Sequence, residues 1–376
     1  MKLLYITSLS GKRVNGFMRS AILAATELGI DFTMACNMDE ADKLGYAADC
    51  KKYGIHTVHV DFDRNPLGYK NLLAHKQLNK IIYDGKYDVI HCNTPIGGVL
   101  GRLCGWEQKV PTVIYQAHGF HFYQGAPLTN WLLYYPVERL LAHWTDILIT
   151  INQEDYKSAQ KFRLRKGGQV VLHPGVGVDI KSFANEVVDR DAKRKELGIE
   201  DKVAFFAAGT LNKNKNHTIL IDAIKKMNRD DVALLIAGEG ENHKKLQHKI
   251  DDLGLSQQVK LLGFRSDIKE ILKAVDCFVF PSLREGLGMS AVEAVASGLP
   301  CVASNNRGVR EVLTDSPFLF EPHDCKTLVK HMTAMLDSTT RTQEAERAQL
   351  TIDQFDISKS IEHYKMIYHS IPTNEI

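Results

Sequence analysis

The chain has 376 residues, of which 44% are hydrophobic and 24% are charged, and its formal net charge at pH 7 is +2. The length suggests two domains, and the composition argues against disordered, collagen-like and coiled-coil proteins. The balanced charge argues against bulk binding to nucleic acid, which usually comes with a large basic excess. The seven cysteines are scattered and form no C-x-x-C pair. We therefore expect a reducing compartment, with neither a disulfide framework nor a structural zinc site.

Short apolar runs alternate with helix-like stretches along the whole chain. In the first half they predict strands at residues 3–7, 32–36, 57–60, 89–92, 112–116, 147–151 and 170–172. In the second half they predict strands at residues 204–208, 233–237, 259–262, 277–280, 301–303 and 318–320. Most of these runs are continuously apolar, which is typical of strands buried on both faces of a parallel sheet. Two such series, each starting afresh, predict an α/β protein with two doubly wound domains.

A turn that contains proline and glycine, at residues 173–179, separates the two series. We therefore place the N-terminal domain at residues 1–175 and the C-terminal domain at residues 176–357. The segment 358–376 begins with an amphipathic helix, which we expect to pack back on the N-terminal domain. No signal peptide or membrane-spanning helix is expected, because the apolar run at the N-terminus is short and no run of 18 apolar residues occurs.

One segment departs from the average composition. Residues 110–137 contain no Asp, Glu, Lys or Arg and are rich in aromatic residues. The segment leads into a predicted amphipathic helix at residues 130–144, for which a place in the core is the favoured interpretation. The alternative is a surface that faces an acceptor or a membrane interface, since Trp and Tyr suit such interfaces.

The loop after the strand at 277–280 carries the most informative pattern. Ligands of open α/β sheets bind at the carboxyl ends of the strands, where this loop lies. Gly286 and Gly288 let a backbone approach a ligand, and the helix that follows offers free N–H groups suited to a diphosphate. Glu285 and Glu293 stand eight positions apart, and carboxylates accept hydrogen bonds from hydroxyl-rich ligands. Two solvated charges are the alternative, but Glu293 lies among alanines and valines and would need a partner.

Residues 282–288 and 293–304 together resemble the E-x7-E signature of retaining glycosyltransferase family 4, and residues 306–311 are similar to the glycine-bearing segment that follows it. The resemblance implies the GT-B fold, in which two Rossmann-like domains face each other across the active site. It also implies that Glu285 contacts the donor sugar and that Glu293 holds the ribose hydroxyls of the nucleotide. Backbone N–H groups near Gly286, Leu287 and Gly288 would approach the donor.

Two other loops of the C-terminal domain match the family in part. After the strand at 204–208 the family usually has an Arg following the Gly and a Lys five residues later; Lys215 matches the Lys, but Thr210 stands in place of the Arg. The resemblance thus implies that Lys215 neutralises the leaving diphosphate, while Lys213 or Arg265 compensates for the missing Arg. Phe264 and Arg265 occupy the position that reads the base. A solvated basic turn is the alternative for the loop around Lys215.

In the N-terminal domain, the loop after the first strand contains Gly16, which the resemblance places near the donor, and Lys12 and Arg13, which we assign to an anionic acceptor or to solvent. His118 follows the strand at 112–116 and matches a family His that contacts the donor sugar near the reacting carbon; His121 is a weaker candidate on the acceptor side. No pair of His or Asp residues has metal-ligand spacing. The resemblance implies neither a metal nor any other cofactor.

We therefore expect a retaining transferase of the hexosyl or N-acetylhexosaminyl type. It would move sugar from a nucleotide diphosphate, with UDP expected, to a glycan or polyprenyl-linked acceptor in cell-surface polysaccharide synthesis. The expected location is the cytoplasm, at the inner face of the cell membrane, without nucleic-acid partners. The alternatives are a GT-B sugar-nucleotide epimerase and a non-catalytic sugar-nucleotide-binding protein.

Overall fold

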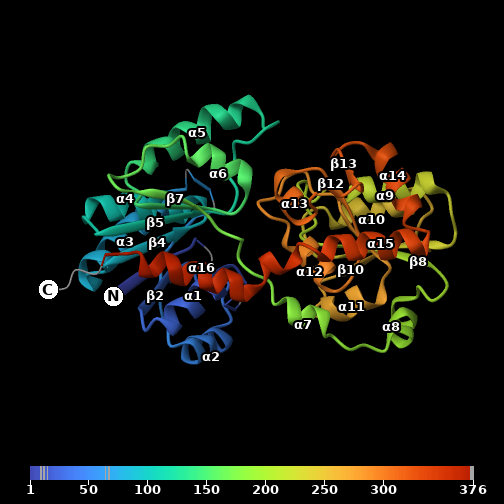
Figure 1. The fold of residues 1–376 in the computed structure, drawn as a ribbon, viewed down its shortest axis with the longest axis horizontal. Coiled ribbons are helices and arrows are strands. Elements are labelled where there is room, and N and C mark those ends of the chain that lie inside the picture. Colours follow the sequence, from blue (N-terminus) through green and yellow to red (C-terminus); the bar gives the residue numbers. More distant parts are fainter. Residues whose placement is uncertain (9–10, 12, 15, 64, 67, 373–376) are drawn as a thin grey trace. The chain divides into compact units, whose positions relative to one another are not determined.

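The computed structural model describes residues 1–8, 11, 13–14, 16–63, 65–66 and 68–372. The chain divides into two compact units (Figure 1). Unit 1 comprises Met1–Gly177 with Ile357–Ile376, and unit 2 comprises Val178–Asp356. The sequence predicted the division two residues earlier, after residue 175. Each of the thirteen predicted strands overlaps a strand of the structure, because a continuous apolar run between polar helices leaves few other conformations to bury it.

Unit 1 holds a seven-stranded parallel sheet in the order β3-β2-β1-β4-β5-β6-β7. Its strands are β1 (Lys2–Ile6), β2 (Asp31–Cys36), β3 (His56–His59), β4 (Val89–Asn93), β5 (Thr112–Ala117), β6 (Ile147–Thr150) and β7 (Gln169–Leu172). Its helices are α1 (Gly16–Glu27), α2 (Lys43–Tyr53), α3 (Lys70–Gly85), α4 (Pro95–Glu107), α5 (Leu128–Ala142), α6 (Gln153–Ala159) and α16 (Ile357–His369).

Each face of this sheet has its own apolar core. On one face α1, α2 and α16 cover the strands, and Tyr364 and Tyr368 of α16 are buried there. On the other face the core takes residues from α3, α4, α5 and α6. The C-terminal helix α16 thus completes unit 1 although the chain reaches it only after unit 2; Figure 1 shows it beside α1.

Unit 2 holds a six-stranded parallel sheet in the order β10-β9-β8-β11-β12-β13. Its strands are β8 (Val203–Ala208), β9 (Val232–Ala237), β10 (Val259–Gly263), β11 (Cys277–Phe280), β12 (Cys301–Ser304) and β13 (Leu319–Phe320). Its helices are α7 (Ile180–Ala184), α8 (Arg190–Leu197), α9 (Thr218–Met227), α10 (His243–Asp252), α11 (Ile268–Ala274), α12 (Met289–Ala296), α13 (Arg307–Val312), α14 (Cys325–Ala334) and α15 (Ser338–Gln349), with a 3₁₀ turn at Ile352–Phe355.

In both sheets the strand order reverses at one place, between β1 and β4 in unit 1 and between β8 and β11 in unit 2. In open parallel sheets a ligand binds outside the carboxyl ends of the strands at this switch point, because the loops there diverge to opposite faces. The loops after β8 and β11 carry the residues from Thr210 to Lys215 and from Glu285 to Gly288. The topology therefore brings the two main motifs of the sequence to one edge of the unit 2 sheet.

The aromatic helix α5 differs from the core helix that was the favoured interpretation of its sequence. Only Leu141 and Ala142 of this helix are buried. Trp131, Tyr134 and Tyr135 are half-buried against the core of unit 1. The opposite side exposes large apolar side chains: Leu128, Leu132, Leu133, Val137 and Leu140. Large apolar side chains stand on both sides of α5, and packing against one sheet cannot bury them all. Tertiary structure therefore decides which side stays in water. In the part of the chain that is described, no helix has the length and hydropathy needed to cross a membrane.

Candidate active site

The loop between β11 and α12 is shaped by two glycines. Gly288 precedes the helix with a φ of 92°, a left-handed conformation that favours glycine. Gly308 of α13 packs against the same loop, and a Cβ there would lie 2.6 Å from the backbone nitrogen of Leu287 and 2.7 Å from the carbonyl carbon of Gly286. Substitution at residue 308 would therefore push the loop away from its place. The glycines hold the first N–H groups of α12 at the carboxyl edge of the sheet.

Lys215 and Glu285 form an ion pair at the switch point of unit 2. The Nζ of Lys215 lies 2.7 Å from Oε1 of Glu285, and both side chains are largely shielded from solvent. Lys215 also lies over the ring of Phe280, 5.0 Å from its centroid. Gly209 makes room for this side chain, since a Cβ there would come within 3.3 Å of Lys215. The structure thus brings together two predicted site residues that are 70 positions apart in the chain.

Hydrogen bonds join the two loops that carry this pair. The Asn214 side chain donates to the carbonyl of Arg284 at 2.9 Å, and the N–H of Leu283 donates to the carbonyl of Asn214 at 2.8 Å. The N–H of Lys215 donates to the Asn212 side chain at 3.0 Å. The lysine is therefore held by its backbone as well as by its charge, which reduces the cost of ordering it around a ligand.

A pocket of about 370 Å³ opens at the same edge of the sheet. Predicted donor-binding residues Thr210, Phe264, Arg265 and Glu293 all line it, together with Gly209, Gly238, Glu239 and Ser290. Burial raises the pKa of Glu293 to about 7, and Lys269 opposes this rise only weakly. Among the described residues, no side chain makes a hydrogen bond to the Glu293 carboxylate. The partner that its apolar helix was expected to require is thus not supplied by these residues, which leaves the carboxylate available to a ligand.

Arg265 does not provide the free charge that was expected to compensate for Thr210. Its guanidinium pairs with Asp267 at 2.5 Å and with Glu196 at 2.7 Å. These hydrogen bonds raise the pKa of Arg265 and lower that of Asp267. Lys213 is exposed on the β8 loop and Phe264 is 74% exposed. The charge of Arg265 is thus neutralised by carboxylates at the wall of the pocket, and Lys213 is the other cation that was expected to compensate.

In unit 1, His118 stands at the carboxyl end of β5, one strand from the switch point. Its Nε2 lies 3.0 Å from Oδ1 of Asn93, the last residue of β4. Phe17 packs its ring edge-on against the imidazole at 5.4 Å. Burial lowers the pKa of His118 to about 4, so the ring is neutral at pH 7. Because Asn93 accepts from Nε2–H, Nδ1 is left as an acceptor, and among the described residues it has no hydrogen-bond partner.

Arg13 and His121, which were predicted on the acceptor side, both make contacts within the protein. Arg13 makes two hydrogen bonds to Asp49 of α2, at 2.8 and 2.5 Å, which accounts for its charge without an acceptor. The ring of His121 stacks on Tyr134 of α5 at 4.6 Å. Gly16, which was predicted on the donor side, begins α1, and a Cβ there would meet nothing within 4 Å. Lys12 lies outside the described residues.

Three residues of these sites escaped sequence reasoning. Asn93 holds His118, Asn214 ties the Lys215 loop, and Gly308 seats the Glu285 loop. Asn93 is the last residue of β4 and Asn214 lies in the loop after β8; polar residues at these places are a signal that sequence reasoning can use. Gly308 belongs to the glycine-bearing segment of the resemblance, but it lies inside a helix, and the sequence offers no sign of its close contact with the Glu285 loop. The G-x-G turn at Gly238 and Gly240 lies against other backbone, because Cβ atoms there would collide with the carbonyls of Gly209 and Leu211.

Among the described residues, one group of His, Cys and acidic side chains has ligand atoms close enough to share a metal ion. It consists of His75, Cys104 and Glu107, on α3 and α4 of unit 1. It includes none of the residues predicted for the active site.

Two family models match the chain, one in each unit. The model of group 1 glycosyl transferases matches residues 189–351, and the model of 4-like glycosyl transferases matches residues 3–152. Two curated relatives extend over most of the chain. EpsD of Bacillus subtilis strain 168, which is named as a glycosyltransferase, is 37% identical over 82% of this chain and 83% of its own. The UDP-Gal:α-D-GlcNAc-diphosphoundecaprenol α-1,3-galactosyltransferase of Escherichia coli is 30% identical over 87% of this chain and 89% of its own.

Solved structures support the same fold. Anabaena HepE, crystallised with UDP and glucose, superposes with a TM-score of 0.79 over 98% of this chain and all of its own, at 23% identity. WaaG, a glycosyltransferase of lipopolysaccharide biosynthesis, superposes with a TM-score of 0.74 over 98% of this chain and all of its own, at 18% identity. The resemblance seen in the E-x7-E segment is thereby confirmed: the chain belongs to the family 4-like, group 1 glycosyltransferases and has their GT-B fold.

Proposed function

We propose that this protein is a retaining glycosyltransferase that moves a hexosyl or N-acetylhexosaminyl group from a UDP-sugar to a polyprenyl-diphosphate-linked glycan. The observation that carries the proposal is the Lys215–Glu285 pair beside a pocket lined by Glu293. The substrates named for the E. coli relative, a UDP-sugar and a diphosphoundecaprenol-linked acceptor, support this choice. The names of two further relatives, a protein in the cps region of Klebsiella pneumoniae and a lipopolysaccharide core mannosyltransferase of Rhizobium meliloti, support a role in surface-polysaccharide synthesis. We place this synthesis at the cytoplasmic side of the membrane.

The donor nucleotide occupies the pocket of unit 2 in this proposal. The Glu293 carboxylate accepts hydrogen bonds from the two ribose hydroxyls, which replace the water it loses on burial. Phe264 and Arg265 line the side where the base lies. The diphosphate faces the N-terminus of α12, where unpaired N–H groups favour an anion.

Lys215 supplies the charge that the leaving diphosphate needs. In the unliganded protein Glu285 neutralises this lysine. A bound diphosphate competes for Nζ, and Glu285 then accepts a hydroxyl of the donor sugar. Because negative charge on the leaving oxygen grows in the transition state, Lys215 stabilises that state more than the bound donor. The departing diphosphate takes the acceptor proton, and no protein nucleophile is required.

His118 of unit 1 contributes through a neutral imidazole. Its Nε2–H is held by Asn93, which fixes the tautomer and turns Nδ1 into an acceptor for a sugar hydroxyl. We assign no metal to the transfer, since Lys215, Lys213 and the N-terminus of α12 supply positive charge to the diphosphate.

The central experiment follows the conversion of UDP-sugars in the presence and absence of an undecaprenyl-diphosphate-linked N-acetylhexosamine. The expected product is an extended glycan with the anomeric configuration of the donor, read from the one-bond C–H coupling of the new linkage by NMR. Activity should persist in excess chelator. An inverted product would contradict the retaining mechanism. An epimer formed from the donor alone, or binding of UDP-sugar without turnover on any acceptor, would contradict transfer.

The exposed side of α5 supports a peripheral contact with the membrane that carries the acceptor. Leu132, Leu133 and Leu140 are 78%, 61% and 59% exposed, and interfacial helices bury such side chains among lipid headgroups. Replacement of Leu132 and Leu133 by Glu should abolish co-flotation with vesicles of phosphatidylglycerol and phosphatidylethanolamine. The matched control is Leu350→Glu, because Leu350 is 83% exposed in unit 2. Equal flotation of the two variants would contradict this contact.

A further inference from the structure

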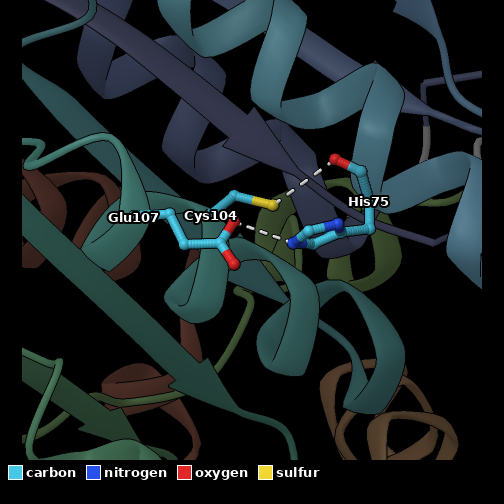
Figure 2. Close-up of side chains that lie close together, drawn as sticks. All are labelled: His75, Cys104 and Glu107. Carbon is cyan, nitrogen blue, oxygen red and sulfur yellow. Dashed lines mark hydrogen bonds and ion pairs between the residues drawn. The ribbon is translucent and has the colours of Figure 1, made fainter.

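Helices α3 and α4 of unit 1 pack side by side and bring four polar side chains together. His75 and Asn79 stand one turn apart on α3, while Cys104 and Glu107 stand one turn apart on α4. Nε2 of His75 lies 2.8 Å from Oε2 of Glu107, and these two atoms and the Cys104 sulfur all lie within 4.8 Å of one another (Figure 2). Cys104 is buried, whereas His75 and Glu107 keep 29% and 31% of their side-chain surface exposed. An ion can therefore reach the group from solvent.

Hydrogen bonds hold this group together. Nε2–H of His75 and the side-chain N–H of Asn79 both donate to Oε2 of Glu107, at 2.8 and 2.6 Å. The Cys104 thiol donates to the His75 carbonyl at 3.8 Å, and the Asn79 amide oxygen accepts from the Gln108 side chain at 2.8 Å. A cation that displaces the protons of Nε2 and of the thiol meets three electron-pair donors, namely the imidazole, the thiolate and the carboxylate.

We propose that His75, Cys104 and Glu107 bind one Zn²⁺ ion that links α3 to α4. Imidazole and thiolate ligands favour zinc over magnesium or calcium, which prefer oxygen. Zinc bonds of about 2.0–2.3 Å place neighbouring ligand atoms roughly 3.3–3.7 Å apart. His75 and Glu107 therefore have to separate by less than about 1 Å and the Cys104 side chain has to turn toward them. Water completes the tetrahedron; the thiol proton leaves to solvent, and the imidazole carries its proton on Nδ1 instead of Nε2.

The spacing explains why no zinc site was expected from the sequence. The ligands come from two helices: α4 supplies Cys104 and Glu107, which are one turn apart, and α3 supplies His75. His75 and Cys104 are 29 residues apart in the chain. The ligand set includes none of the residues assigned to transfer, so the role of the ion is to stabilise unit 1. Failure of this proposal would leave the assignment of the transferase site untouched.

The test titrates the full-length protein, reduced with a phosphine and stripped of metal by chelator. Zn²⁺ alone is measured against a chromophoric competitor, and Co²⁺ alone is added to a second sample. We expect one ion per chain, a thiolate-to-cobalt charge-transfer band, and a rise of several degrees in one melting transition with Zn²⁺. The variants His75→Gln, Cys104→Ser and Glu107→Gln should each weaken Zn²⁺ binding by at least about tenfold. Cys104→Ser should also abolish the charge-transfer band.

The matched control is Cys50→Ser, which removes a half-buried helical thiol from the same unit and should leave Zn²⁺ binding unchanged. Glu107→Gln keeps the test valid if Cys104→Ser fails to fold, because Glu107 lies at the surface. The proposal is overturned if the wild-type protein does not bind Zn²⁺ more tightly than Glu107→Gln. It is also overturned if Cys104→Ser and Cys50→Ser bind Zn²⁺ equally well. UDP binding, measured in parallel, should be the same with and without the ion.

Discussion

The two units place polar groups at the switch points of similar sheets, but they satisfy those groups differently. In unit 2 the cations near the pocket are already paired, Lys215 with Glu285 and Arg265 with Asp267. In unit 1, Nδ1 of His118 and Nδ2 of Asn93 are buried without partners among the described residues. A paired site is assembled before the ligand arrives and must exchange partners, whereas an unpaired one gains hydrogen bonds outright. Unit 2 is therefore expected to tolerate substitutions less well than unit 1.

The largest effect is expected from Lys215→Ala. It removes the cation that faces the leaving diphosphate and leaves Glu285 as an uncompensated, largely buried charge. Turnover should fall by about 10²–10³-fold, the usual cost of losing one preorganised electrostatic contact. Steady-state kinetics of sugar transfer measures it. Lys213→Ala should lose less, since Lys213 is exposed and only adds to the charge that Lys215 supplies; a loss as large as that of Lys215→Ala would reverse the roles given to the two lysines. Lys244→Ala, at an exposed position of α10 that has no part in the proposed site, is the control.

Gly308→Ala tests how tightly the Glu285 loop is seated. The new methyl would lie 2.6 Å from the backbone of Leu287, so the loop has to move. We expect a loss of roughly 1–3 kcal/mol in the free energy of unfolding of unit 2, as for other overpacked sites. Chemical denaturation followed by fluorescence measures it. Gly16→Ala in unit 1 meets nothing within 4 Å and should leave stability unchanged; equal effects would remove the contrast between the units.

His118→Ala should have a smaller effect than Lys215→Ala. The proposed role is one hydrogen bond to a sugar hydroxyl, worth about 1 kcal/mol, so turnover should fall roughly fivefold. Asn93→Ala frees the imidazole to take either tautomer and should cause a similar loss. Kinetics of both single variants and of the double variant measures the coupling. If the two losses simply add, Asn93 does not act through His118.

The last prediction is a pH dependence from Glu293. Burial raises the pKa of this carboxyl to about 7, so folding favours its protonated form. Its contribution to stability is full below the unfolded pKa near 4.5 and is lost as the pH rises through 7. The melting temperature of the unliganded wild type, compared with that of Glu293→Gln, should therefore decline between about pH 5 and 7. A constant difference across this range would contradict the raised pKa.

The sequence determined the strands, the two sheets and the placing of most candidate residues at strand ends. Continuous apolar runs are most readily buried as strands, and parallel sheets collect their carboxyl ends at one edge, so Lys215, Glu285 and His118 could be placed at those edges without coordinates. The roles predicted for them came from the family resemblance. Which charges pair was decided only by tertiary structure, as in Arg13 with Asp49. The same holds for the exposed side of α5 and for the ligands shared by α3 and α4. Each of these depends on which helix faces are packed together, and helix packing joins residues whose separation in the chain carries no signal.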